Sequence, residues 1–235
     1  MGLINFFENM PAKIVFITGT DTGVGKTLLT ALLLQYLRQK GVCALAMKPF
    51  SCGSRADAEL LHRLQNGDVT LDEINPIHFP EPVAPLVAGR IHQRSISLKQ
   101  IRERILTLSN RCRWLLIEGI GGLCVPLTER HLVIDLIKEL DCETIVVSWN
   151  RLGTLNHTLS AVKLLQHAGI QRITVGLMTH EPSDFSVGTN GKILAELLKP
   201  TQVIPVRFLG REACTSAAVK KNAKKIKITL AKFLL

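Results

Sequence analysis

The stretch GTDTGVGKT, residues 19–27, places closely spaced glycines, a lysine and a threonine between an apolar run and a leucine-rich segment. Gly23 and Gly25 let the backbone turn tightly and bring N–H groups toward phosphate oxygens. The leucine-rich segment has a helical pattern, and a helix N-terminus adds partial positive charge at the same place. Lys26 can then reach the β- and γ-phosphates of a nucleotide, and the Thr27 hydroxyl can bind Mg²⁺. The stretch therefore predicts a phosphate-binding loop.

One detail of this loop departs from the usual spacing, in which four residues separate the first glycine from Gly-Lys. Here five residues separate Gly19 from Gly25, and Thr20 occupies the usual first-glycine position. A glycine-rich turn followed by a chance Gly-Lys-Thr is the alternative interpretation. The predicted strand before the stretch and the predicted helix after it favour the phosphate-binding loop.

Outward from the loop, apolar strand-like runs alternate with amphipathic helical segments, as in parallel α/β folds. Strands are expected over residues 13–18, 44–47, 114–117, 144–148, 173–178 and 203–206. Helices are expected over residues 26–40, 56–65, 97–109, 132–140, 155–168 and 192–198. Residues 75–89 contain four prolines and are expected to form a long ordered loop. The pattern predicts an α/β, P-loop NTPase-like fold with a mostly parallel central sheet and helices on both faces.

The composition is that of a globular chain. The 235 residues are 46% hydrophobic and suit one large domain. The longest apolar runs are strand-sized, whereas a membrane span needs about 20 apolar residues. No basic segment followed by a long apolar run marks a signal peptide. We expect a cytoplasmic protein with no membrane partner, and a single P-loop domain over residues 1–235, with 1–12 a flexible extension and 216–235 a basic C-terminal helix.

The charge and the cysteines suggest no additional partner. The net charge is +10, and six lysines lie between Lys220 and Lys232. A basic patch can bind nucleic acid, but isoleucines and leucines interleave with these lysines, as on the solvated face of a terminal helix. No nucleic-acid-binding motif accompanies the charge, so no nucleic-acid partner is expected.

The six cysteines form no C-x-x-C pair and are expected to be buried small side chains in a reducing cytosol.

Two acidic residues and a second lysine are candidates for the nucleotide site. Glu118 is expected to end the strand over residues 114–117 and is followed by glycines that allow close approach of a ligand. Lys48 is expected at the carboxyl end of a strand, where open α/β sheets bind ligands. Asp57 is either a further Mg²⁺ ligand or an ordinary charge in the first turn of a helix.

Further motifs accompany the loop, in order along the chain. They are residues 48–53 (KPFSCG), Asn75-Pro76 with Glu81-Pro82 and Pro85, residues 118–122 (EGIGG) with Pro126-Leu127, residues 152–158 (LGTLNHT) and residues 166–169 (QHAG). Together with the loop they resemble the dethiobiotin synthetase family, from residue 13 to about residue 212.

The resemblance implies an ATP- and Mg²⁺-dependent ligase that acts as a homodimer in biotin biosynthesis. Its diamine substrate, 7,8-diaminopelargonate, takes up CO₂ as a carbamate, and ATP phosphorylates the carbamate. The second amine then displaces phosphate and closes the ureido ring. A P-loop scaffold suits this chemistry, because phosphoryl transfer depends mainly on positioning and charge neutralisation.

The resemblance also implies roles for individual residues. Catalysis would involve Lys26, Lys48 and Thr22, and Mg²⁺ would be held by Thr27, Asp57 and Glu118. The nucleotide would contact Gly23, Val24, Gly25, Lys26, Thr27, Leu28, Asp57, Glu118, Gly119, Ile120, Gly121, His180, Pro205, Val206, Arg207 and Glu212. The diamine would contact Ser51, Cys52 and, from the opposite subunit, Gly153, Thr154, Leu155 and Asn156.

The chain departs from the family pattern at two positions. Cys52 stands where the family usually has Ser or Thr touching the substrate, and a thiol is a weaker hydrogen-bonding group. Either the neighbouring Ser51 compensates or the diamine binds more weakly. His180 stands where the family usually has an Asn that contacts adenine, which leaves the selectivity for ATP open.

Two other functions fit parts of the sequence. A cobyrinate-type amidoligase usually carries a second, glutaminase domain, for which 235 residues leave no room. A ParA- or MinD-like ATPase switch normally carries an extra lysine near the start of its phosphate loop, where this chain has Thr20. DNA-stimulated ATP hydrolysis would favour the switch, and diamine-dependent ADP release would exclude it.

The identity of residue 180 predicts a relaxed choice of nucleotide. An Asn amide presents a donor and an acceptor side by side to adenine, whereas a neutral imidazole carries them on opposite sides of its ring. A bidentate contact contributes about 1–3 kcal/mol of base discrimination, roughly 5- to 150-fold. We therefore expect GTP or CTP to support appreciable turnover when kcat/KM is compared for the three nucleotides. A preference for ATP above about 100-fold, with little change in His180→Asn, would mean that a backbone group reads adenine instead.

Overall fold

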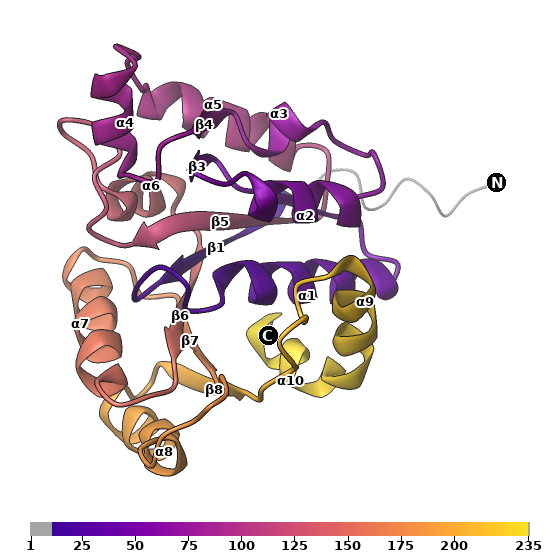
Figure 1. The fold of residues 1–235 in the computed structure, drawn as a ribbon, viewed down its shortest axis with the longest axis vertical. Helices are drawn as coiled ribbons and strands as arrows, with labels where there is room; N and C mark the ends of the chain where they lie inside the picture. Colours follow the sequence, from indigo (N-terminus) through magenta and orange to yellow (C-terminus); the bar gives the residue numbers. More distant parts are fainter. Residues whose placement is uncertain (1–10, 235) are drawn as a thin grey trace.

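The computed structural model describes residues 11–234, and its centre is a six-stranded parallel sheet (Figure 1). The strand order is β2-β5-β1-β6-β7-β8, and every neighbouring pair is parallel. The strands are β1 (Lys13–Gly19), β2 (Ala44–Met47), β5 (Trp114–Gly122), β6 (Glu143–Trp149), β7 (Ile173–Met178) and β8 (Gln202–Val206). The predicted α/β fold with a parallel central sheet is confirmed.

Helices cover both faces of the sheet (Figure 1). One layer contains α1 (Lys26–Gln39), α2 (Ala56–Leu64), α9 (Ser216–Lys225) and α10 (Lys227–Ala231); the other contains α5 (Leu98–Ser109), α6 (Val133–Leu140), α7 (Thr154–His167) and α8 (Val187–Leu197). This division follows from right-handed crossovers that leave β1 in one direction and build the rest of the sheet in the other. No helix within residues 11–234 is both long and apolar enough to cross a membrane.

The reversal of direction at β1 positions the functional site. The chain runs from β1 through α1 to β2 on one side, and later places β6, β7 and β8 on the other side. Ligands of open α/β sheets bind in the crevice that such a reversal leaves at the carboxyl ends of the strands. The glycine-rich residues 19–27 occupy this point, directly between β1 and α1.

The core explains why the central strands read as continuous apolar runs. Val15, Phe16 and Ile17 of β1 are buried on both sides, because helices cover both faces of the sheet. All leucines of α1 except Leu28 belong to the same core and are also buried. Burying one such leucine contributes about 1.5–3 kcal/mol relative to leaving it exposed.

The prediction of a long loop over residues 75–89 is wrong. This region contains β4 (Ile77–Phe79) and α4 (Pro85–Ile91). Strand β4 pairs with β3 (Phe50–Cys52) in a small second sheet, and Pro85 begins α4, where its missing N–H costs nothing. Three-residue strands carry no readable periodicity, so this pair could not be predicted. The short helix α3 (Leu71–Ile74) was also not predicted, although Thr70 and Glu73 form a capping box at its start.

Other boundaries also differ from expectation. Strand β5 continues through Glu118 to Gly122, so Glu118 lies within the strand rather than at its end. Helix α8 begins at Val187, five residues before the expected start at residue 192. The basic C-terminal region is not one helix but α9, α10 and a 3₁₀ turn (Lys232–Leu234). Of the expected flexible extension over residues 1–12, residues 1–10 lie outside the described residues.

The expectation of buried cysteines is wrong for most of them. Only Cys142 is buried, whereas Cys52 and Cys112 are intermediate and Cys43, Cys124 and Cys214 are exposed. The exposed ones lie in loops next to strands and helices, where a small side chain is not drawn into the core. All six are free thiols.

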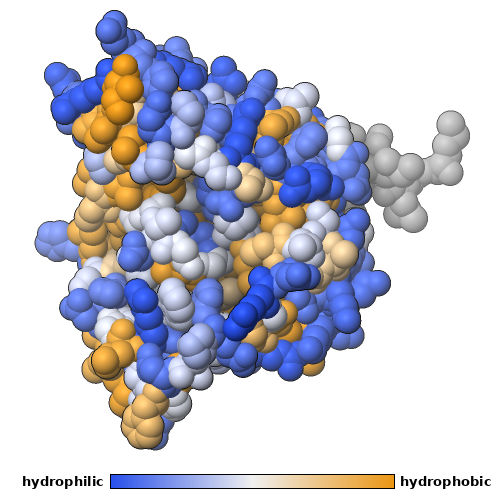
Figure 2. Space-filling model, in the orientation of Figure 1, coloured by the Kyte–Doolittle hydropathy of each residue, from blue (hydrophilic) through white to orange (hydrophobic). Residues whose placement is uncertain are grey.

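Large apolar side chains are exposed at two places along one side of the molecule. Figure 2 shows apolar surface at the upper left, over α4, and at the lower left, near α8. Val87 and Ile91 belong to α4, while Leu152 (81% exposed) and Phe185 (98% exposed) lie in the loops before α7 and α8. Apolar patches of this kind often mark interaction surfaces.

The edge strand β2 is covered by a side chain rather than by another strand. The Gln65 amide accepts a hydrogen bond from Ala46 N at 2.8 Å and donates to Ala46 O at 3.1 Å. It also donates to Leu61 O at 3.1 Å, and Gln65 is fully buried. The side chain thus satisfies the backbone groups that an edge strand otherwise leaves unpaired.

Replacing Gln65 by Leu is expected to destabilise the protein by about 2–4 kcal/mol, because each buried backbone group left unpaired costs about 1–3 kcal/mol. Denaturant unfolding measures the loss. The matched control is Gln39→Leu, whose exposed amide donates to Lys220 O, and which should change stability by no more than about 0.5 kcal/mol. Equal effects of the two variants would contradict this role of Gln65.

Candidate functional site

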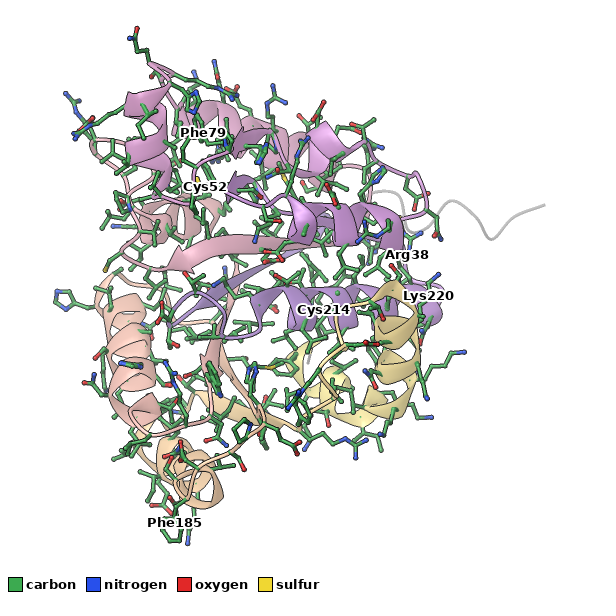
Figure 3. The ribbon with its side chains drawn as sticks, viewed as in Figure 1. Arg38, Cys52, Phe79, Phe185, Cys214 and Lys220 are labelled. Carbon is green, nitrogen blue, oxygen red and sulfur yellow. The ribbon has the colours of Figure 1, made fainter. Side chains whose placement is uncertain are left out.

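A cavity of about 860 Å³ opens at the carboxyl ends of the central strands. The glycine-rich loop forms one wall, and residues that follow β2, β3, β7 and β8 form the others. Figure 3 labels Cys52 from β3 and Cys214 from the segment before α9, which line it from the two halves of the molecule. The cavity therefore lies at the reversal point that the sheet topology creates.

The loop has the backbone conformation expected for binding phosphate. Gly23 (φ +76°) and Gly25 (φ +102°) adopt left-handed conformations that other residues rarely tolerate. A Cβ atom on Gly25 would also lie 3.2 Å from the Met178 side chain. Helix α1 begins directly after Gly25 without a side-chain cap, so its first N–H groups remain available to an anion. Lys26 folds back over the loop and donates to Asp21 O at 2.8 Å.

A buried ion pair adjoins the loop. Lys48 Nζ lies 2.6 Å from Glu118 Oε1 and 3.1 Å from Asp57 Oδ2. The Thr27 hydroxyl donates to the same Oε1 atom, also at 2.6 Å. Strand register explains the meeting, because Met47 of β2 pairs with Ile117 of β5 and the next residues are Lys48 and Glu118. Lys48 is only 5% exposed and Glu118 only 1%.

Burial and neighbouring charges shift the pKa values of both lysines. Burial, helped by the charge of Lys48, lowers the pKa of Lys26 to about 8, although Glu118 partly opposes this. Burial also lowers the pKa of Lys48, but Glu118 and Asp57 outweigh it, so its pKa lies above the ordinary value. Lys48 is therefore a fixed positive charge, whereas an anion bound in the loop would favour the charged form of Lys26.

Three oxygen-bearing side chains suit a hard divalent cation. Thr27, Asp57 and Glu118 line the cavity together, and Mg²⁺ is usually held by one or two carboxylates plus phosphates and water. Glu118 Oε2 is buried and has no hydrogen-bond partner among residues 11–234. The same residues contain no cluster of three or more His, Cys, Asp or Glu side chains. The donor set thus fits a cation that draws its other ligands from a nucleotide.

At the opposite end of the cavity, His180 forms part of the lining and packs against Trp149 with the two rings tilted by 42°. The His180 ring lies 4.4 Å from the Trp149 ring, centre to centre, and the Arg151 guanidinium lies 4.5 Å from the Trp149 ring centre. Burial lowers the pKa of His180 below its ordinary value; a backbone hydrogen bond with Val24 opposes this shift, and the charge of Arg151 adds to it. Neither Trp149 nor Arg151 was predicted to belong to the site, although Trp149 directly follows the strand expected over residues 144–148.

Most of the predicted site residues line this cavity. They are Thr22, Gly23, Gly25, Lys26, Thr27, Leu28, Lys48, Ser51, Cys52, Asp57, Glu118, Ile120, Gly121, His180 and Arg207. The sequence did not predict the walls formed by residues 82–84 and by residues 208–211, 213 and 214. The first wall follows β4, which is too short to predict, and the second follows β8 in a segment without helix or strand.

The remaining predicted residues do not line the cavity of the same chain. Val24, Gly119 and Val206 are buried beneath it, while Pro205 and Glu212 are exposed beside it. The turn Gly153, Thr154, Leu155 and Asn156 lies apart from it at the start of α7. Thr154 is buried instead in a hydroxyl cluster with Ser148 and Thr158, and its Oγ1 atom lies 2.7 Å from Ser148 Oγ.

Comparison with solved structures shows the same fold in P-loop ATPases. The septum site-determining protein MinD of Pyrococcus horikoshii, solved with Mg-ADP, aligns with a TM-score of 0.63 at 20% identity, over 95% of this chain and 96% of that one. A ParA family ATPase of Chlorobium tepidum aligns with a TM-score of 0.56 at 18% identity, over 95% of this chain and 98% of that one. At such low identity the likeness shows the fold alone.

Comparison with known sequences indicates a family, whereas the solved structures indicate only the fold. A family model described as an AAA domain matches residues 13–210. The ATP-dependent dethiobiotin synthetase BioD of Methanocaldococcus jannaschii is 41% identical, over 66% of this chain and 75% of its own length. That of Thermodesulfovibrio yellowstonii is 36% identical, over 78% of this chain and 83% of its own length. The phosphate loop, the buried Lys48–Glu118 pair and these likenesses agree, and the chain belongs to the ATP-dependent dethiobiotin synthetase family.

Proposed function

We propose that this protein uses ATP and Mg²⁺ to close the ureido ring of dethiobiotin from 7,8-diaminopelargonate and CO₂. The observation that carries the proposal is the meeting of Lys26, Lys48, Thr27, Asp57 and Glu118 in one cavity. Two lysines and a hard-cation site neutralise the charge of a phosphoryl group in transfer. The cavity extends past this cluster toward β3, which leaves room for a second substrate next to the γ-phosphate.

The cluster also supports a direction for the nucleotide. Lys48 and Glu118 lie on the β2–β5 side of the phosphate loop, and His180 and Arg207 lie on the β7–β8 side. Because Mg²⁺ and the lysines act on the terminal phosphates, the γ-phosphate would face Lys48 and the base would face His180. Pro205, Val206 and Glu212 would then support the base end from beside and beneath it.

Thr27, Asp57 and Glu118 would hold Mg²⁺, which when bound neutralises charge on the β- and γ-phosphate oxygens. Glu118 supports this assignment, because one of its oxygens is already satisfied by Lys48 and Thr27 while the other is unpaired within the described chain. Lys48 holds both carboxylates in place through its contacts with Glu118 and Asp57.

The reaction follows from this arrangement. One amine of the substrate adds to CO₂ and loses a proton, giving a carbamate, which Thr22 and Lys48 would orient. A carbamate oxygen attacks the γ-phosphorus, and the bond to ADP breaks. The second amine then attacks the carbamoyl carbon and loses a proton, and phosphate leaves as the ring closes. Lys26 and Lys48 offset the negative charge in each step.

The substrate's distant carboxylate would be bound by a second subunit. The turn Gly153, Thr154, Leu155 and Asn156 opens α7, whose first N–H groups have no side-chain cap and suit an anion. Because the turn lies outside the cavity of its own chain, it would serve the cavity of a partner. The exposed Leu152 and Phe185 beside it would then be covered in a homodimer. We propose that this homodimer acts in the cytoplasm, without nucleic acid or membrane.

Replacing either Lys26 or Lys48 by Gln is expected to lower kcat by about 10²-fold or more, because each neutralises charge that develops in the transition state. ADP release with and without the diamine measures the effect. The control is Lys224→Gln, an exposed lysine of α9 far from the phosphate loop, which should leave kcat unchanged. Near-normal turnover of Lys48→Gln would remove Lys48 from the site, and ADP release indifferent to the diamine would refute the proposed reaction.

Two measurements test whether two subunits form each substrate site: the mass of the protein in solution, and the activity of a mixture of two variants with impaired activity. Sedimentation should give about twice the 25.9 kDa of one chain. Asn156→Asp adds a charge that repels the substrate's carboxylate yet stabilises a helix N-terminus, so it should raise KM for the diamine without loss of stability. Mixing Asn156→Asp with Lys48→Gln should restore activity, because one site of a mixed dimer is intact. A fully active monomer, or no recovery in the mixture, would defeat the idea.

A further inference from the structure

Ser51 occupies a rigid position three residues after Lys48, on the short strand β3. Strand β4 pairs with it, and Gly53 N donates to Phe79 O at 2.9 Å. Asn75 Nδ2 donates to Lys48 O at 2.7 Å and so fixes the start of the same segment. The backbone around Ser51 is therefore held on both sides of the residue.

Ser51 lines the cavity, and its buried hydroxyl is not satisfied by the residues that the structure describes. Ser51 is 2% exposed, and its Oγ atom has no hydrogen-bond partner within residues 11–234. Some other buried hydroxyls are paired; Thr158 donates to Ser148 Oγ at 2.8 Å, for example. The hydroxyls of Thr18 and Thr144 also lack a partner within residues 11–234, but unlike Ser51 these two residues do not line the cavity. A hydroxyl both donates and accepts, and a buried one without a partner is unusual. The arrangement leaves Ser51 ready for a polar group of a ligand.

The neighbouring Cys52 is a poorer candidate for the same contact. Burial, and then the charge of Glu81, raises the pKa of the Cys52 thiol to about 11, so it stays protonated at neutral pH. A neutral thiol is a weak donor and a weak acceptor. Successive residues of a strand point to opposite faces, so Ser51 and Cys52 meet different parts of the cavity that both of them line.

We infer that Ser51, not Cys52, supplies the hydroxyl that contacts the amine and carbamate end of the diamine, and that it sets the affinity for this substrate. The inference rests on the proposed function, since it names the contact within the same site. Rotation about the single Cα–Cβ bond of Ser51 carries its oxygen toward the ligand without moving the backbone. Lys48, close by in sequence and in the same cavity, then holds the carbamate's charge while Ser51 fixes the amine.

The test compares kcat, KM for 7,8-diaminopelargonate and KM for ATP in Ser51→Ala, Ser51→Cys, Cys52→Ala and Ser54→Ala. Both Ser51 variants should raise KM for the diamine at least about tenfold, because a hydrogen bond to a charged group is lost, and should change KM for ATP less than about twofold. Cys52→Ala should change both values less than about threefold. Ser54→Ala is the matched control, because Ser54 lines the same cavity but its hydroxyl already accepts from Ala56 N.

The outcomes separate this inference from the proposed function. An unchanged KM for the diamine in the Ser51 variants, or an equal rise in Cys52→Ala, overturns the role of Ser51 while leaving the function intact. A wild-type protein that releases no ADP in response to the diamine overturns both. Ser51→Cys keeps nearly the shape of serine, and an unchanged KM for ATP shows that the site is folded, so a packing defect in Ser51→Ala cannot imitate the expected result.

Discussion

The contact between Lys48 and Glu118 is the interaction on which the rest of the site depends. A carboxylate that is 1% exposed is tolerated only when it is paired and hydrogen-bonded. Lys48 from the end of β2 and Thr27 from the first turn of α1 both reach the same oxygen. The end of β2, the first turn of α1 and the middle of β5 must therefore meet at one point, and the order β2-β5-β1 in the sheet brings them there. Losing one partner would leave a buried charge uncompensated.

The chemical nature of the side chains that line the cavity changes from one end of it to the other. The phosphate loop and the lysines are cationic, the wall with Ser51 is uncharged and polar, and the wall with His180 is aromatic. Each part carries a buried polar atom that is unpaired within the described chain: Glu118 Oε2, Ser51 Oγ and His180 Nε2. The buried hydroxyls of Thr18 and Thr144 also lack a partner within residues 11–234, but these residues do not line the cavity. The three unpaired atoms of residues that line it indicate three ligand regions. A cation with phosphates, a diamine and a base would satisfy them.

Local patterns predicted the centre of the site, and the sequence left its walls undetermined. The loop with Gly23, Gly25 and Lys26 could be identified because its glycines, strand and helix are neighbours in sequence. Lys48 and Glu118 could each be assigned to the site because both were expected where a buried strand ends, although β5 continues through Glu118 as its ladder with β1 persists. Their direct contact was not predicted. The pair β3–β4 could not be predicted, because its strands are too short to show a period and their pairing joins segments far apart in sequence. The tilted contact of Trp149 with His180 depends likewise on long-range register.

The fate of an oxygen atom of CO₂ tests the central claim most directly. If a carbamate attacks the γ-phosphorus beside Lys48, the oxygen that bridges carbon and phosphorus stays with the phosphate when the ring closes. Turnover with freshly added ¹⁸O-labelled CO₂ should therefore place one labelled oxygen in each inorganic phosphate released, as mass spectrometry would show. Unlabelled phosphate, formed with an oxygen from water, would contradict the account, because this site would then hydrolyse ATP without joining it to the ureido carbon.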